Sequence, residues 1–213
     1  MARYLPMPKE SERDLRGRLK KLVPAGVYNA KWRQVEEIYK GFVADLPDVG
    51  GKKNPMHKNL YGALACFAFF EAFERKLSDD EMRDVLRGNT VRGNGRSGLA
   101  RVDLNKPSVQ RIAYLLLNLG AKMINRHKKY GAWGNTWGVA VNPLGRKEGV
   151  SVHLVGCPIA DFAKSHGYES VMPIFCESDY EAIRSNMGKA LYREHTVAEG
   201  FDDCDYWIRN LEA

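Results

Sequence analysis

The sequence predicts an α+β fold, with a helical N-terminal half followed by an antiparallel sheet of about four strands with two intervening helices. In the first half, apolar residues recur at three- and four-residue steps, the period of one helix face. After Gly131 the period changes to two, beginning with Trp137, Val139 and Val141, which is typical of strands. Helices followed by strands in this order favour α+β.

Five helices are predicted before Gly131. The strongest covers 59–76, and Cys66 within its apolar stripe is interpreted as a small core residue. Ser78 and Glu81 form a capping box for a shorter helix that Gly88 closes. A turn-rich linker precedes the strongest helix. The predicted helical ranges are 10–21, 30–46, 59–76, 79–88 and 107–129, and the linker is 47–55.

The last third combines strands with two helices. In its third strand, Arg193 and His195 share one side and Thr196 lies on the other. The predicted strands are 137–141, 150–154, 191–196 and 205–209, and the helices begin at Pro158 and cover 174–187. We therefore expect a helical region (1–131) and a cysteine-containing α+β region (132–213) that pack as one domain.

Composition restricts the class of protein. With 213 residues, 44% hydrophobic and 28% charged, the chain is expected to fold as a water-soluble protein. It contains no apolar run of the ~20 residues that a membrane helix needs, and residues 1–23 lack the apolar centre of a secretory signal. The four cysteines show no paired spacing, so reduced thiols and a cytoplasmic location are predicted.

The formal charge of +7 is compatible with solubility alone, a small anionic substrate or nucleic-acid binding. The basic stretch 87–101 and Lys128-Lys129 would carry nucleic-acid binding, but the stretch has no aromatic residue for base stacking. Gly93, Gly95 and Gly98 match G-x-G-x-x-G, yet a helix precedes them and a loop follows, which is the wrong context for a nucleotide site. A surface loop, or a lid whose arginines close over an anion, fits better.

Cys157 is the first candidate catalytic residue. It follows a predicted strand and precedes Pro158, a residue type preferred at the first position of a helix. A thiol at a helix N-terminus faces unpaired N–H groups, which can lower its pKa from about 8.5 towards neutrality. Cys157 is therefore either a reactive thiol or a buried structural cysteine.

Cys176 and Asp179 are three residues apart, and Tyr180 is one further on, so all three share one face of a predicted helix. A carboxylate beside a thiol or a bound water can act as general base. A face that combines a thiol with a carboxylate suits a site better than either core or solvent, so Cys176 and Asp179 are predicted to be catalytic.

Four further residues are predicted to bind substrate: Arg193, Thr196, Cys204 and Asp205. Arginine can hold a carboxylate with two parallel hydrogen bonds. The alternative is an exposed ion pair of Arg193 with Glu194 or Asp205. Although three of the cysteines, His153 and His195 fall in one region, the thiols lack the close spacing of a zinc site, so no metal or cofactor is predicted.

The C-terminal segment also resembles a known family. The resemblance covers roughly the last 60 residues and rests on CPIADFA at 157–163, MPIFCESDY at 172–180, Arg193, TVAEG at 196–200 and CDY at 204–206. This order of motifs resembles the bacterial L-2-amino-thiazoline-4-carboxylic acid hydrolase family. Val197 stands where leucine is expected, and Tyr206 where phenylalanine is more usual.

The resemblance implies a hydrolase that opens a cyclic amidine (thiazoline) carboxylate to an N-carbamoyl amino acid. In the implied site, Arg193 holds the substrate carboxylate, and either Cys157 attacks the amidine carbon or Asp179 activates water. Backbone N–H groups at the start of the helix that Pro158 opens, together with Thr196, would steady developing charge. Two alternatives stay open: a non-enzymatic thiol protein that binds a soft metal or senses oxidants, and a nucleic-acid binder. Homo-oligomerisation is also left open.

Overall fold

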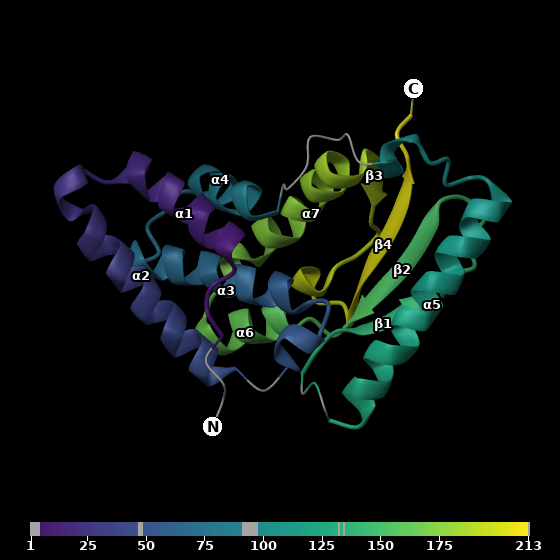
Figure 1. Ribbon diagram of the computed structural model, residues 1–213, viewed down its shortest axis with the longest axis horizontal. Helices are drawn as coiled ribbons and strands as arrows, with labels where there is room; N and C mark the ends of the chain where they lie inside the picture. The colour runs from purple at the N-terminus through teal and green to yellow at the C-terminus, as the bar shows by residue number, and fades with distance from the viewer. Residues whose placement is uncertain (1–4, 47–48, 91–97, 132, 134, 213) are drawn as a thin grey trace.

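The computed structural model describes residues 5–46, 49–90, 98–131, 133 and 135–212. The predicted α+β class is confirmed: five helices precede the first strand, and two more lie between the strands (Figure 1). The helices are α1 (Lys9–Leu22), α2 (Ala25–Asp45), α3 (His57–Ala72), α4 (Asp79–Thr90), α5 (Pro107–Lys129), α6 (Pro158–His166) and α7 (Met172–Met187). The strands are β1 (Gly138–Val141), β2 (Val150–Val155), β3 (Lys189–Tyr192) and β4 (Asp203–Asn210).

The core is built around α3. This helix is apolar around nearly its whole circumference, and from Leu60 to Phe70 every residue is buried. A helix without a polar face must be enclosed by other elements, and Figure 1 shows α1, α2, α4, α6 and α7 grouped around it. Phe67 stacks on Phe175 of α7, with ring centroids 4.4 Å apart, and on Tyr168, at 4.9 Å. These contacts join the helical region to the cysteine-containing region.

The sheet has the order β1-β2-β4-β3, and each neighbouring pair is antiparallel. In the central pair, His153 lies opposite Asp205, and Leu154 lies opposite Cys204. Side chains alternate between the two faces of a strand. Leu154 and Cys204 therefore share one face, and His153 and Asp205 share the other.

Local sequence signals place most element ends correctly. The Ser78 capping box is confirmed, because the Glu81 N–H donates to Ser78 Oγ at 3.3 Å and the Ser78 N–H donates to a Glu81 carboxylate oxygen at 2.8 Å. Gly88 does not close α4, which continues to Thr90. α2 begins at Ala25, five residues before the predicted start, because Pro24 already provides an extended N-cap.

The third strand is shorter than predicted. β3 ends at Tyr192, so Arg193, His195 and Thr196 lie in the connection to β4 instead of on a strand. The chain leaves the ladder here because the Arg193 side chain turns inward towards α7.

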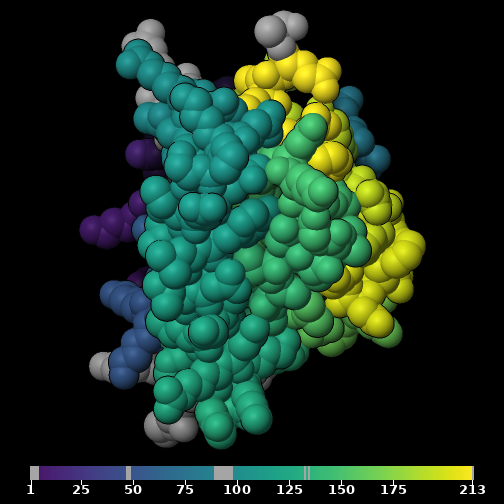
Figure 2. Space-filling view, turned by 90° about the vertical axis from the view of Figure 1, so that its right-hand side faces the viewer, coloured from purple at the N-terminus to yellow at the C-terminus, as the bar shows by residue number. Residues whose placement is uncertain are grey.

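α5 packs along the free edge of β1 and presents apolar residues to solvent. Asn125 Oδ1 accepts a hydrogen bond from the Val139 N–H, and Asn125 Nδ2 donates one to the Val139 carbonyl, both at 2.8 Å. These bonds pair the backbone groups that an edge strand would otherwise leave open. On the opposite side of the helix, large apolar side chains are exposed, and Figure 2 shows this outward surface in teal. The most exposed are Ile112, Leu115, Leu116 and Leu119, at 58–62%. In the described part of the chain, each helix is too short or too polar to cross a membrane.

Candidate active site

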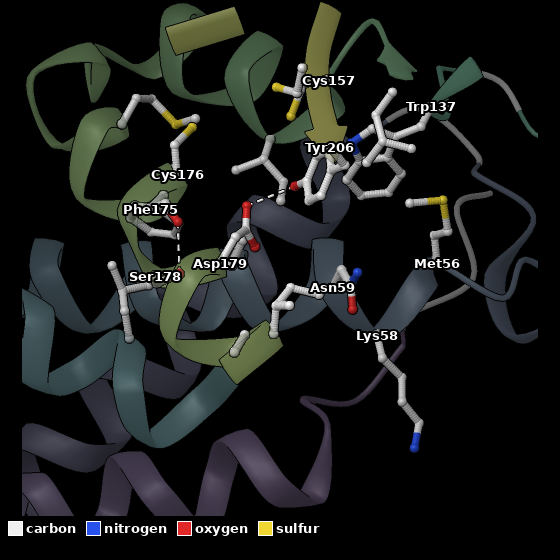
Figure 3. A pocket seen from close by; sticks show the side chains of 18 of the residues that line it. Met56, Lys58, Asn59, Trp137, Cys157, Phe175, Cys176, Ser178, Asp179 and Tyr206 are labelled. Atoms are coloured by element: carbon white, nitrogen blue, oxygen red, sulfur yellow. Dashed lines mark hydrogen bonds between the residues drawn. The ribbon is translucent and has the colours of Figure 1, made fainter. Parts of the chain in front are cut away.

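A cavity of about 380 Å³ lies where the first turn of α3, the helix α7 and the inner face of the sheet meet. Figure 3 shows its lining side chains, which come from elements far apart in the sequence. Trp137, Met172 and Phe175 supply apolar wall, while Asn59 and Asp179 supply polar groups. This combination suits a small ligand with polar ends.

Three of the four cysteines line this cavity: Cys157, Cys176 and Cys204. They come from the start of α6, from α7 and from β4. The thiols lie close enough together that Cys204 helps to raise the pKa of both Cys157 and Cys176. Cys66 is separate and fully buried in α3, as predicted for a core residue. The tertiary structure therefore gathers the three C-terminal thiols into one place.

Cys157 is the N-cap of α6, as predicted, but its pKa moves in the opposite direction to the one expected. Burial raises the pKa of the Cys157 thiol to about 11, although the backbone N–H groups of Ala160 and Ile159 and the Trp137 side chain act to lower it. The desolvation of a thiolate in this wall outweighs the helix N-terminus. At neutral pH Cys157 is therefore a neutral thiol in the free protein.

Asp179 is held rigidly at the cavity wall. Its Oδ2 accepts hydrogen bonds from the Arg193 guanidinium at 2.6 Å and from the Tyr206 hydroxyl at 2.7 Å. Arg193 also donates to the Cys176 carbonyl at 2.9 Å, which ties it to α7. Within the described residues, no group donates to Asp179 Oδ1, and this side chain is 34% exposed. One carboxylate oxygen is thus anchored, and the other is available to a ligand.

The other predicted site residues lie outside the cavity lining. Arg193 is behind the wall, with its side chain only 2% exposed, and its guanidinium is engaged by Asp179 and the ring of Tyr206. Thr196 donates to Glu199 at 2.9 Å. Asp205 lies on the opposite face of the sheet, where it pairs with Arg146 at 2.6 Å. The ion pair of Arg193 with Asp205 considered from the sequence is not formed.

Several lining residues were not predicted from the sequence. Tyr206 comes two residues after Cys204 on β4, so the period of two could have placed both side chains on the same face. Trp137, Lys58 and Asn59 carry no local signal, because they reach the cavity only through the packing of α3 and β1. The Lys58 ammonium points away from the cavity centre in Figure 3 and pairs with Glu10 at 3.7 Å.

The raised thiol pKa values predict a steep pH dependence of alkylation. Burial raises the pKa of Cys157 to about 11 and, with the neighbouring Cys204, that of Cys176 to about 12. Because only the thiolate reacts, iodoacetamide should modify these thiols slowly at pH 7, and the rate should rise about tenfold per pH unit up to about pH 10. Mass spectrometry of peptides from timed reactions measures each site. A Cys157 rate that levels off near pH 7 would contradict the assignment.

The fold and the cavity define an α+β protein with a cavity lined by three thiols and an anchored carboxylate. The sequence model of the L-2-amino-thiazoline-4-carboxylic acid hydrolase family matches residues 58–208, and the chain belongs to this family. The match begins at the first turn of α3, so it includes three helices before β1, well beyond the last 60 residues that carry the resemblance. Searches of curated proteins and of solved structures found no match.

Proposed function

We propose that the cavity hydrolyses a small cyclic amidine carboxylate, and that L-2-amino-thiazoline-4-carboxylic acid is the first substrate to test. The observation that carries this proposal is Asp179, whose Oδ2 is anchored while Oδ1 faces a cavity lined by three thiols. Membership of a hydrolase family supports the reaction class.

The substrate has two charged ends that fit different parts of the cavity. Its amidinium group would donate hydrogen bonds to Asp179 Oδ1, a charge-assisted contact. Its carboxylate would bind at the first turn of α3, where the Asn59 side chain lines the cavity. Arg193, assigned to this carboxylate from the sequence, instead positions Asp179.

In the proposed reaction, Asp179 acts as general base towards water. The water oxygen bonds to the amidine carbon while one proton passes to Asp179. The ring carbon–sulfur bond then breaks, and Asp179 returns its proton to the departing sulfur. The new hydroxyl releases its own proton to solvent as the carbonyl forms, which balances the positive charge that the amidinium brought in. The product is an N-carbamoyl amino acid with a free thiol. Direct attack by water is favoured over attack by Cys157, because burial raises the pKa of that thiol to about 11.

The test is turnover of the thiazoline by purified protein, with the new thiol and the carbamoyl product measured separately. Cys157→Ser separates the two routes: hydrolysis should persist if water attacks directly and should be lost if Cys157 is the nucleophile. Absence of turnover with thiazolines and other cyclic amidines would overturn the proposal.

The second candidate is a non-enzymatic thiol protein that binds a soft metal or senses oxidants. The gathering of Cys157, Cys176 and Cys204 in one cavity supports it. It predicts stoichiometric zinc, copper or iron on the thiols, or reversible disulfide formation, without turnover.

A further inference from the structure

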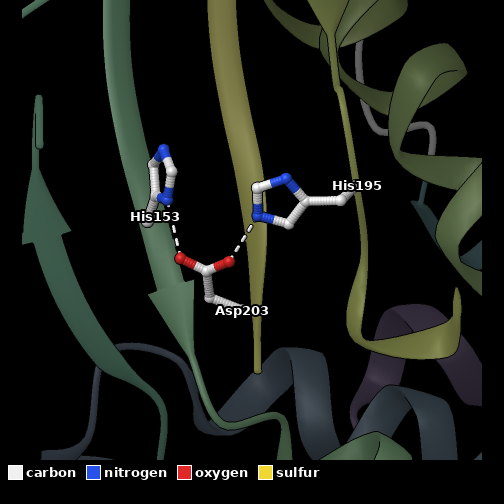
Figure 4. Close-up of side chains that lie close together, drawn as sticks. All are labelled: His153, His195 and Asp203. Atoms are coloured by element: carbon white, nitrogen blue, oxygen red, sulfur yellow. Dashed lines mark hydrogen bonds and ion pairs between the residues drawn. The ribbon is translucent and has the colours of Figure 1, made fainter. Parts of the chain in front are cut away.

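A second polar cluster lies behind the cavity, on the opposite face of the sheet (Figure 4). His153 of β2 approaches Asp203 of β4, with Nδ1 2.6 Å from Oδ2. His195, in the connection between β3 and β4, places Nε2 2.5 Å from Oδ1 of the same carboxylate. Since Leu154 and Cys204 face the cavity, their strand neighbours His153 and Asp203 face away from it. The cluster is therefore separate from the thiols.

His153 is flanked by carboxylates on both ring nitrogens. Asp203 lies at Nδ1, and Asp205 Oδ1 lies 3.3 Å from Nε2. A neutral imidazole carries one N–H, so it can donate to only one of them, and the other contact sets lone pair against lone pair. Among the described residues, His153 Nε2 and Asp205 Oδ1 are both buried without a hydrogen-bond partner. A cation between His153 Nδ1 and Asp203 would leave the N–H free to point at Asp205.

The cluster also has the donor set of a metal site. The nearest ligand atoms of His153, His195 and Asp203 all lie within 4.8 Å of one another. Two imidazole nitrogens and one carboxylate oxygen suit divalent transition metals such as Zn²⁺. In the described part of the chain, Asp203 pairs with neither lysine nor arginine, so its charge is left for the cluster.

The surroundings provide the outer support that metal-binding histidines have. Asp205 is completely buried, and Arg146 holds its Oδ2 at 2.6 Å. A carboxylate fixed in this way, 3.3 Å from His153 Nε2, would accept an N–H from that nitrogen once Nδ1 binds a metal.

We propose that His153, His195 and Asp203 bind one divalent transition-metal ion of the Zn²⁺ class. The ion replaces the hydrogen-bond protons between the rings and Asp203, and each ring then carries its N–H on its other nitrogen. His195 and Asp203 are 21% and 24% exposed, so an ion can enter from solvent and keep water in the remaining positions. The bound ion links the connection between β3 and β4, which contains Arg193, to the central strands β2 and β4.

Metal binding to the whole protein, freed of metal with a chelator and kept reduced, tests the proposal. Calorimetry with Zn²⁺ should show one site, and Co²⁺ should give visible absorption without the intense ultraviolet band of cobalt–thiolate bonds. His195→Ala and Asp203→Asn should each weaken Zn²⁺ binding at least about 100-fold, because each removes a ligand. His127→Ala, a histidine stacked on Trp133 outside the cluster, should bind as the wild type does.

The readouts do not depend on activity, so the proposal can fail while the hydrolase assignment stands. Circular dichroism checks that each variant is folded, and the Co²⁺ spectrum of the wild-type protein is informative without any variant. Lack of Zn²⁺ and Co²⁺ binding would overturn the proposal and leave a cluster that holds protons alone. A thiolate band, or binding unaffected by both ligand variants, would place the metal elsewhere and overturn it as well.

Discussion

Asp179→Asn should lower kcat/KM for the thiazoline substrate by about 10²–10⁴-fold, the usual contribution of a general base. The amide keeps an oxygen that can accept from Arg193 and Tyr206, so the wall of the cavity should be retained. It cannot take a proton from water or balance an amidinium charge. Steady-state kinetics should therefore show a lower kcat, together with a higher KM for the cationic substrate.

A structural loss must be separated from this chemical one, because the amide leaves the Arg193 charge less well compensated. Thermal unfolding of the same preparation provides the check. Glu177→Gln, on the exposed face of the same helix, is the matched control: its ion pair with Arg83 is exposed, and its activity should be unchanged. If Asp179→Asn retains wild-type kcat, Asp179 is not the base.

Arg193→Met should destabilise the fold by about 3 kcal/mol, because it leaves Asp179 and the Cys176 carbonyl without their shared donor. In a chain of this size, that corresponds to a fall in Tm of roughly 6–12 °C. Arg83→Met is the matched control, since Arg83 is 45% exposed where Arg193 is 2% exposed. The loss there should stay below about 1 kcal/mol.

The double variant Arg193→Met with Asp179→Asn distinguishes the roles of the pair. Removing both charges should recover part of the stability lost in Arg193→Met, because no buried charge is left unpaired. Activity should not recover, because the base is still missing. Full additivity of the two losses in unfolding free energy would show that the ion pair does not couple them.

The helical half and the class of fold could be predicted because their signals are local. The all-apolar stretch of α3 requires enclosure, and the change from helical to alternating period marks the start of the sheet. The capping box at Ser78 and the N-cap position of Cys157 are likewise written in neighbouring residues. The end of β3 is not local: it depends on Arg193 turning towards α7.

The residues of the site also divide into those that local spacing predicts and those that packing places. Cys176 and Asp179 share a helix face, so spacing alone predicted that they would lie together, and both line the cavity. Asp205 follows Cys204 directly on β4, so the period of two could have placed it on the other face of the sheet. Spacing could not show that Arg193 is engaged in holding Asp179. The position of Arg193 depends on where the connection after β3 runs, and this is set by packing.

By itself, the sequence determined the fold class, the family and the residue types available for chemistry, because each depends on order and spacing along the chain. Only the tertiary structure decided which side chains meet and what charge they carry. The Cys157 thiol illustrates the reason. Its place at a helix start acts to lower its pKa, but burial, a property of the whole fold, raises the pKa by a larger amount.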